Sequence, residues 1–502
     1  MQSNSIKFAI TLFSRIWVAI ISIFFIPIYV KIIGAESYGL VAFYGTLSGS
    51  LAILDLGLST AVSRQVTLLI RQPDKQKDTK DLIFSVEIIY WIVAFLIGGI
   101  VILLAEPISL YWVKSKDLPI HTIKKSVMLM GVVFAAQFPA SIYNGVLIGL
   151  DKQVVNALAT IASTTLKAIG VIAVLKFVDG TIESYFLWQV IITFLSTYFL
   201  RLLVWRDISW LKEKSQFSFY QLKKIWKFAT GMLIISLVTF FLGQIDKIIV
   251  SKLVLLEFVG YYNLAFMMAN GISQVIAPMY PIIFPKFATL ESENNQKELI
   301  LLYHKSCRWI SIIIFPIGIT LILFAKEILI LWTNNLVLTN NTAPILRVAT
   351  AGTICNSMMW IPYWYLLAKG ITKFTIYQNV IASLILVPLL FFWVGKYGAL
   401  GASFVWLAVN IGYLTISLPI FHMLYLKGEL LKWYKNDIAQ PFFYAIIFIG
   451  IVKYIELNLE YNIYILLGIT LFFIILYIIL IPELRFFFTE IKSKYLKWRL
   501  YH

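Results

Sequence analysis

The chain has 502 residues, of which 60% are hydrophobic and only 13% are charged, and its mean hydropathy is +0.85. Soluble domains carry about 25% charged residues, so this composition excludes an ordinary soluble protein. Apolar runs of about eighteen residues or more recur from one end to the other, each long enough to cross a bilayer as a helix. We therefore predict an all-α polytopic membrane protein.

The net charge of +17 does not indicate nucleic-acid binding, because no basic stretch forms a compact domain. In a membrane protein it points instead to the bias of cytoplasmic loops toward Lys and Arg, and to an anionic lipid or substrate. The two cysteines, Cys307 and Cys355, provide neither a disulfide framework nor metal-site spacing. The four histidines are scattered, so we expect no metal site and no bound cofactor.

Taken in chain order, the apolar runs predict fourteen spanning helices. They are expected at residues 8–33, 39–62, 82–105, 125–149, 153–177, 182–204, 226–252, 258–284, 305–325, 343–368, 373–395, 398–421, 440–456 and 461–481. The first run is too long for a cleavable signal peptide and is followed by Lys31, so we expect it to be retained as the first span. The connecting loops are too short to hold a separate soluble domain.

The positions of the basic residues predict the orientation of the chain. With the N-terminus placed in the cytoplasm, two thirds of the 42 Lys and Arg residues fall on the cytoplasmic side. Such an excess is characteristic of cytoplasmic loops. We therefore expect both termini in the cytoplasm.

Short motifs recur at one constant spacing and at matching points of the predicted topology, which indicates duplication of a six-helix unit. Because six is even, both copies enter the membrane in the same direction, and a pseudo-two-fold axis runs along the membrane normal with a cavity between the halves. We predict two six-helix lobes at residues 1–210 and 211–425, then two extra helices and a basic cytoplasmic tail at 426–502. The matched positions are Glu36 and Gly39 with Glu257 and Gly260, and Gly149 and Lys152 with Gly370 and Lys373.

Ionisable side chains inside spans cost roughly 2.5–3.5 kcal/mol each, so they are candidate functional residues. Arg15 in the first span and Asp55 in the second have similar expected depths on consecutive antiparallel helices. They could form a structural ion pair that offsets both costs. Alternatively, Arg15 could face the cavity while Asp55 orients it or exchanges with substrate, and both interpretations can hold together.

Further along the chain, Lys167 lies near the middle of the fifth span, where no acid has a matching depth, although Glu87 lies shallower in the third. We expect Lys167 to line a wet cavity. Asp246 and Lys247 are adjacent in the outer part of the seventh span and point about 100° apart, so one can face the cavity and the other a neighbouring helix. Arg308 near the inner end of the ninth span could be an anchor or a ligand.

Aromatic residues gather at span ends, as in residues 360–365. This pattern fits the aromatic belt at a membrane interface, or contact with a sugar or a prenyl chain. Polar residues inside spans could bind a glycan or form hydrogen bonds between helices. They are Gln137, Asn270, Gln274, Asn356 and Asn410.

Several motifs in series carry a resemblance to a known family. They are FSR at 13–15, KIIGAESYGL at 31–40, LDLGL at 54–58, LIGLDK at 147–152, QIDK at 244–247 and VGYY at 259–262. Each motif is loose alone, but the series resembles the polysaccharide (O-antigen, Wzx-type) flippases of the MOP exporter superfamily. The likeness covers spans one to twelve.

The resemblance implies a flippase, not an enzyme, in the bacterial inner membrane. It would move an undecaprenyl-pyrophosphate-linked oligosaccharide from the inner to the outer leaflet by alternating access through a cationic central cavity. Its implied partners are the lipid-linked glycan, the bilayer, and the polysaccharide polymerase and chain-length regulator, with no nucleic acid. The candidates for binding substrate are Arg15, Lys167, Lys247 and Arg308. The candidates for H⁺ or Na⁺ coupling, or for orienting the cations, are Asp55, Glu87 and Asp246.

Three other activities are less compatible with these residues. The resemblance to lipid II flippases is weaker, because their first helix carries an Arg-Asp pair and here Ile16 follows Arg15. Drug exporters of the same superfamily handle cations in acidic cavities, which a deep Arg and Lys do not suit. A polysaccharide polymerase or ligase needs large external loops, and the external loops predicted here are short.

Overall fold

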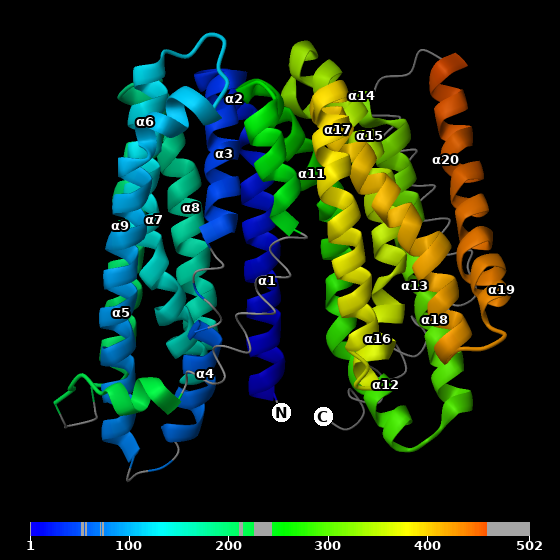
Figure 1. The fold of residues 1–502 in the computed structure, drawn as a ribbon, viewed down its shortest axis with the longest axis horizontal. Coiled ribbons are helices and arrows are strands. Elements are labelled where there is room, and N and C mark those ends of the chain that lie inside the picture. The colour runs from blue at the N-terminus through cyan, green and yellow to red at the C-terminus, as the bar shows by residue number, and fades with distance from the viewer. Residues whose placement is uncertain are drawn as a thin grey trace. The chain divides into compact units, whose positions relative to one another are not determined.

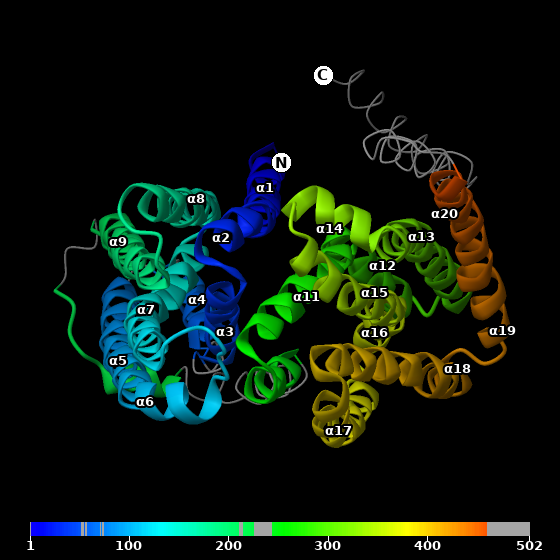
Figure 2. The ribbon, with the colours of Figure 1, turned by 90° about the horizontal axis from the view of Figure 1, so that it is seen from above.

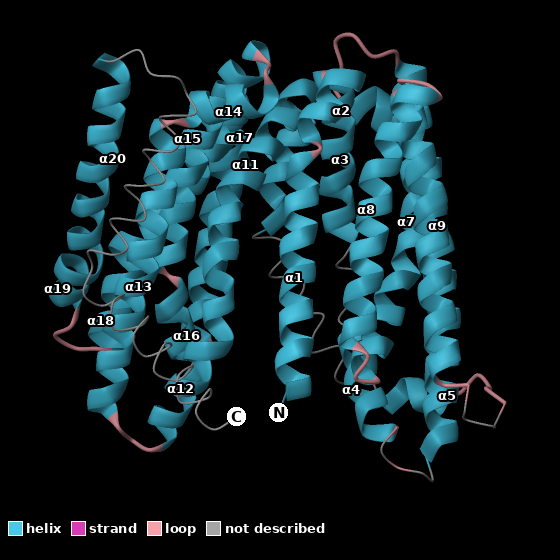
Figure 3. Cartoon of the chain, turned by 180° about the vertical axis from the view of Figure 1, so that it is seen from behind, coloured by secondary structure: helices cyan, strands magenta, loops and turns pink. Residues whose placement is uncertain are grey.

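The computed structural model describes residues 2–51, 55, 58–70, 72, 75–209, 214–224 and 243–458. Nearly all of this part is helical (Figure 3). The single extended pairing among the described residues is an isolated bridge between Lys114 and Leu255. Nine described segments are long and apolar enough to cross a membrane. The all-α, multi-span prediction is confirmed. The number fourteen is not, because the seventh and fourteenth predicted spans lie largely or wholly outside the described residues.

The chain divides into two compact units, Met1–Gly260 and Tyr261–His502. This division falls later than the lobe boundary expected at residue 210. The helices of the first unit are α1 (Gln2–Phe24), α2 (Ile26–Ile33), α3 (Ala35–Leu51), α4 (Leu58–Leu69), α5 (Gln76–Leu103), α6 (Ala105–Pro107), η3 (Ile108–Trp112), α7 (Ile120–Gly149), α8 (Gln153–Phe177) and α9 (Ile182–Asp207) (Figure 1). Residues 219–224 and 243–253 are also helical.

The later division follows from how residues 243–260 are held. The Leu256 N–H donates to the Lys114 carbonyl oxygen at 2.8 Å, and Trp112 Nε1 donates to Ser251 Oγ at 3.1 Å. A Cβ placed on Gly39 would lie 2.1 Å from the Leu256 carbonyl oxygen, so α3 approaches this segment backbone to backbone. These contacts tie the segment to the first unit, although the sequence places it in the second repeat.

The repeated Glu36 has a structural role at the start of α3. Its carboxylate accepts hydrogen bonds from the backbone N–H groups of Lys116 and Asp117 and from Ser115 Oγ. Three charge-assisted donors on one carboxylate hold the loop after η3 against the N-terminus of α3. The motif that carries the repeat therefore also fixes a turn.

Helix α7 is the centre of the first unit, where α4, α5 and α9 pack against it (Figure 2). Two glycines allow α4 to come close. A Cβ on Gly145 would lie 2.6 Å from the Ser59 carbonyl oxygen, and one on Gly149 would lie 2.7 Å from that of Ser63. Small residues four apart permit this close approach between helices in lipid.

We expect Gly145→Ala to destabilise the protein by about 1–3 kcal/mol, because the added methyl group forces α4 and α7 apart. The measurement is the midpoint of thermal unfolding of the purified protein in detergent. Gly99→Ala on α5 is the matched control, because a Cβ there meets nothing within 4 Å. Equal midpoints for the two variants would contradict the close α4–α7 contact.

The described part of the second unit consists of helices joined by short turns. Its helices are α11 (Leu256–Ile276, which begins in the first unit), η4 (Ala277–Met279), α12 (Tyr280–Ser292), α13 (Gln296–Leu323), α14 (Ala325–Thr333), α15 (Leu336–Met358), α16 (Trp360–Ala368), α17 (Lys373–Gly412), η5 (Tyr413–Ser417), α18 (Leu418–Tyr425), α19 (Leu430–Lys432), η6 (Trp433–Ala439) and α20 (Gln440–Asn458). Asparagine side chains cap two helix starts: Asn295 accepts from Glu298 N, and Asn335 accepts from Leu338 N.

Helix α17 contains a sharp break at Gly398, whose φ of 59° and ψ of −143° are not helical. Glycine adopts this positive φ without a steric penalty. The two predicted spans at 373–395 and 398–421 are thus separate helical segments that meet at this residue.

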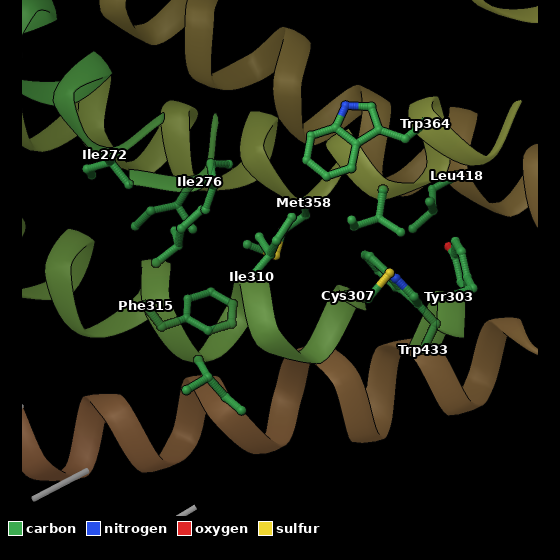
Figure 4. Packing of buried hydrophobic residues seen from close by; sticks show 14 of the residues in the cluster. Ile272, Ile276, Tyr303, Cys307, Ile310, Phe315, Met358, Trp364, Leu418 and Trp433 are labelled. Atoms are coloured by element: carbon green, nitrogen blue, oxygen red, sulfur yellow. The ribbon is translucent and has the colours of Figure 1, made fainter. Parts of the chain in front are cut away.

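Helix α13 is the centre of the second unit. Its buried residues Cys307, Ile310 and Phe315 belong to one core cluster that includes Met358 of α15 and Trp433 of η6 (Figure 4). Helix α20, which corresponds to the predicted thirteenth span, also lies along α13. The first of the two extra helices is therefore part of the second unit's core.

Candidate functional site

Asp55 is held by hydroxyl groups of its own unit. Its Oδ1 accepts from Tyr90 Oη at 2.6 Å and from Ser141 Oγ at 2.9 Å, and its Oδ2 accepts from Ser59 Oγ at 2.7 Å. These donors come from α5, α7 and α4. Asp55 is half-buried, and these three hydroxyl groups fix the orientation of its carboxylate.

Arg15 does not pair with Asp55, which corrects the structural ion pair considered from the sequence. The Arg15 side chain is exposed, and no hydrogen bond or ion pair joins it to another residue in the part of the chain that the structure describes. Similar depth on neighbouring helices did not bring the two charges together, because Asp55 is turned toward α5 and α7.

Lys167 on α8, like Arg15, has no ion-pair partner among the described residues. Its side chain is half-buried, and no partner is found for it among the described residues. Helices α1 and α8 pack along each other, with Ser14 Oγ donating to the Ala157 carbonyl oxygen at 3.2 Å and Trp17 Nε1 donating to Thr165 Oγ1 at 2.9 Å. Within the described residues, two cations without a partner therefore sit on adjacent helices of the first unit.

Glu87 lies in a polar cluster that the sequence did not reveal. Its carboxylate forms an ion pair with Arg201 of α9, and it accepts hydrogen bonds from Tyr143 Oη at 2.7 Å and from Trp205 Nε1 at 3.1 Å. The Glu87 side chain is only 6% exposed, whereas that of Arg201 is 40% exposed. The available signal was the spacing of Arg201 and Trp205, which places both on one helix face.

The other three predicted site residues are dispersed. Asp246 and Lys247 are half-buried in the helical segment 243–253 of the first unit. In the second unit, Arg308 Nε donates to the Asn436 carbonyl oxygen at 3.3 Å and lies 3.9 Å from Asp437 Oδ1. Arg308 thus helps to hold η6 against α13, and its role toward substrate stays a prediction.

A cluster around His304 was also missed by the sequence. His304 Nδ1 contacts Asp437 Oδ2, and His304 Nε2 lies 3.1 Å from Glu429 Oε2. The histidine is on α13, and both acids lie in the segment that leads into α20. The large separation of these residues in the sequence hid this cluster, which joins the extra helix to the second unit.

Each unit contains a cavity. The first has a volume of about 260 Å³ and is lined by Asp55, Ser48, Gln137, Ser141 and apolar residues of α5 and α7. The second has a volume of about 360 Å³ and is formed by α15, α16, α17, η5 and α18. Its lining includes Trp360 and Asn356, both noted in the sequence.

The two cavities occupy matching positions in the predicted repeat. Four residues from α7 line the first, and each has a partner at one constant spacing along the chain that lines the second. This spacing differs by a single position from that of the repeated motifs, so it adds a structural observation to the predicted duplication. The pairs are Phe134 with Asn356, Gln137 with Met359, Phe138 with Trp360, and Ser141 with Tyr363.

Comparison with known sequences yields one family and one relative. Residues 28–339 match the family described as "Polysaccharide biosynthesis protein". A protein of Shigella flexneri described as "Putative O-antigen transporter" is 22% identical over 379 residues, which cover 74% of this chain and 87% of that protein.

Comparison with solved structures shows the fold. The lipid II flippase MurJ in an inward closed conformation superimposes with a TM-score of 0.70 at 15% identity, covering 94% of this chain and 97% of the other. An inward-facing multidrug resistance MATE family transporter of the MOP superfamily superimposes with a TM-score of 0.65 at 15% identity, covering 84% of this chain and 96% of the other. Together with the sequence matches, these findings confirm the resemblance indicated by the motifs.

Proposed function

The chain belongs to the polysaccharide biosynthesis protein family, and from this premise we propose that it is a flippase for an undecaprenyl-pyrophosphate-linked oligosaccharide. The proposal places the chain in the bacterial inner membrane with both termini in the cytoplasm. It takes the glycan from the inner to the outer leaflet by alternating access, and it catalyses no covalent step. The O-antigen description of the Shigella flexneri relative and the transporter fold both support it.

One observation supports the choice of an anionic lipid-linked substrate. Arg15 and Lys167 are cations within apolar spans of adjacent helices, and the described residues offer neither of them a counter-charge. A charged group in lipid is retained where it faces water or a ligand. Arg in particular presents a planar fork that binds phosphate oxygens bidentately. We assign the pyrophosphate to these two residues.

Deletion of the chromosomal copy tests the function. We expect surface glycan to disappear and the lipid-linked repeat unit to accumulate, accessible to a glycan-binding lectin only in inverted membrane vesicles. A plasmid-borne copy is the control and should restore both readouts. Accumulation of unpolymerised repeat unit on the outer leaflet would indicate a polymerase instead, and unchanged surface glycan would overturn the proposal.

We further propose that Asp55 couples transport to an H⁺ or Na⁺ gradient. The carboxylate is half-buried beside a cavity of about 260 Å³, within reach of hydroxyl oxygens that a small cation or proton can use. Glu87 is less suited to this role, because Arg201 already neutralises it. The geometry therefore favours Asp55 among the predicted acids of the first unit.

We expect Asp55→Asn to lower transport to the rate seen when the gradient is collapsed, because the amide cannot ionise. The measurement is glycan flipping in vesicles with and without an imposed H⁺ or Na⁺ gradient. Ser141→Ala is the control, since it removes one of three hydroxyl donors and keeps the carboxylate. Transport by Asp55→Asn that stays fully gradient-dependent would rule out this role.

A further inference from the structure

The second-unit cavity formed by α15, α16, α17, η5 and α18 is lined by many aromatic residues and by no charged side chain. Trp360, Tyr363 and Trp364 of α16 line it together with Phe374 of α17 and Tyr413 of η5. Its volume of about 360 Å³ lies within the range of roughly 300–1,000 Å³ typical of small-molecule sites. Trp364 is only 3% exposed, so it is not an interfacial anchor of the kind expected for an aromatic belt.

Polar side chains line the same cavity and have no protein partner within the described residues. Thr375, Gln378 and Asn379 lie within the first two turns of α17, and no hydrogen bond to their side chains is found there. The same is true of the Tyr413 hydroxyl. All four residues are half-buried, so their polar groups face the cavity without a competing protein partner among the described residues. They are available to hydrogen-bond to an occupant of the cavity.

One further amide is already oriented by the protein. Asn356 Nδ2 donates to Asn410 Oδ1 at 2.8 Å, and Asn410 Nδ2 donates to the Trp406 carbonyl oxygen at 2.7 Å. Asn410 is fully buried. These hydrogen bonds use one N–H of the Asn356 side-chain amide, and none among the described residues uses its Oδ1, which remains free to accept.

The residues that line this cavity indicate which class of ligand it can bind. The residues that line the cavity include no Asp, Glu, Lys or Arg, so the site suits neither a pyrophosphate nor a coupling ion. A prenyl chain would leave all the unpaired amides and hydroxyls unsatisfied. An uncharged sugar satisfies both features, because aromatic rings cover its apolar C–H faces while neutral amides and hydroxyls pair with its OH groups.

Residues at matched positions of the repeat give the two cavities different chemistry. Where the first cavity has Ser141, which donates to Asp55, the second has Tyr363, and where the first has Phe138 the second has Trp360. The same helix face is thus built for a carboxylate in one unit and for aromatic stacking in the other.

We propose that the cavity lined by Trp360, Gln378 and Asn379 is a subsite for an uncharged sugar of the transported glycan. This proposal rests on the flippase function proposed above and assigns the sugar to a site separate from the cations that hold the phosphate. The lipid-linked substrate is then recognised by two chemically different groups of residues.

Binding of two probes to the purified full-length protein tests the subsite. The first probe is the oligosaccharide released by mild acid from the cell's own lipid-linked intermediate, and the second is inorganic pyrophosphate. We expect the double variant Gln378→Leu/Asn379→Leu to bind the oligosaccharide at least about tenfold more weakly, since two neutral hydrogen bonds are lost, and to bind pyrophosphate unchanged. Arg15→Ala should show the reverse pattern.

Two controls make the outcome unambiguous. Tyr377→Leu removes an aromatic ring from the same turn of α17, is 67% exposed and does not line the cavity, so it should bind both probes normally. Trp360→Leu should weaken only the oligosaccharide, as an independent variant. Oligosaccharide binding that is insensitive to the Gln378, Asn379 and Trp360 substitutions overturns the subsite alone. Surface glycan that persists after gene deletion overturns the flippase function itself.

Discussion

Replacement of Arg15 by alanine should reduce surface glycan display at least about 30-fold at matched membrane levels of the protein. A hydrogen bond to a charged group contributes roughly 1.5–3 kcal/mol, and about 2 kcal/mol corresponds to a 30-fold change in binding. The described structure gives Arg15 no ion-pair partner, so the substitution leaves no uncompensated protein charge behind. Folding should therefore be normal, and the loss should appear in transport.

Three companion variants separate a substrate ligand from a structural charge. Arg15→Lys should restore display in part, because lysine keeps the charge but lacks the bidentate fork. Arg15→Ala/Asp55→Ala should remain inactive, since the Asp55 carboxylate is bonded to Tyr90, Ser141 and Ser59 and not to Arg15. Lys31→Ala, an exposed cation at the other end of the same span, is the control and should display glycan normally.

Recovery of display in the double variant would contradict this interpretation and make Arg15 a partner of Asp55 after all. Lys167→Ala extends the test to α8, and Lys176→Ala, in the last turn of the same helix, is its control. Loss of display with Lys167→Ala and normal display with Lys176→Ala would place the second phosphate contact at Lys167.

The second large effect is expected in stability. Glu87→Ala should destabilise the first unit by about 2–3 kcal/mol, because it removes the partner of Arg201 and the acceptor of two donors, the buried Tyr143 and the half-buried Trp205. The partial exposure of Arg201 keeps this cost below that of a fully buried pair. The measurement is the thermal unfolding midpoint, with the amount of protein in the membrane as a second readout.

Glu106→Gln is the matched control for Glu87. Glu106 also pairs with a cation, Lys124, at 2.7 Å, but both side chains are largely exposed, at 60% and 42%. Exposed ion pairs contribute little net stability because water screens them, so this variant should unfold near the parent midpoint. Normal stability of Glu87→Ala with loss of gradient dependence would instead assign Glu87 to ion coupling.

The depth of each charged residue in the membrane could be predicted from the sequence, but its interaction partner could not. The depths of Arg15, Asp55 and Glu87 follow from counting residues along apolar spans, because a helix rises by a fixed amount per residue. Depth does not say which way a side chain points around its helix. Asp55 and Arg15 share a depth and do not meet, whereas Glu87 meets Arg201 of α9, a helix that is not its neighbour in sequence.

The duplication could be recognised from motifs in the sequence, but the two matching cavities could not. Glycine and glutamate at a constant spacing indicated duplication, and the loop held by Glu36 gives that motif a physical role. The matching cavities could not be inferred, because each is formed by helices that converge only after folding. Trp360 and Asn356 were noted from the sequence, but the sequence did not show that they line the same cavity as Gln378.

The sequence by itself determined that this is a helical, multi-span membrane protein with a resemblance to polysaccharide flippases and with rare charges inside its spans. These properties are local, since an apolar run in lipid must form a helix to satisfy its backbone and a buried charge is costly wherever it stands. Only the tertiary structure decided which charges are paired, which cavity is acidic and which is aromatic. Those outcomes depend on how each helix is rotated and packed against distant ones, and no run of neighbouring residues contains that information.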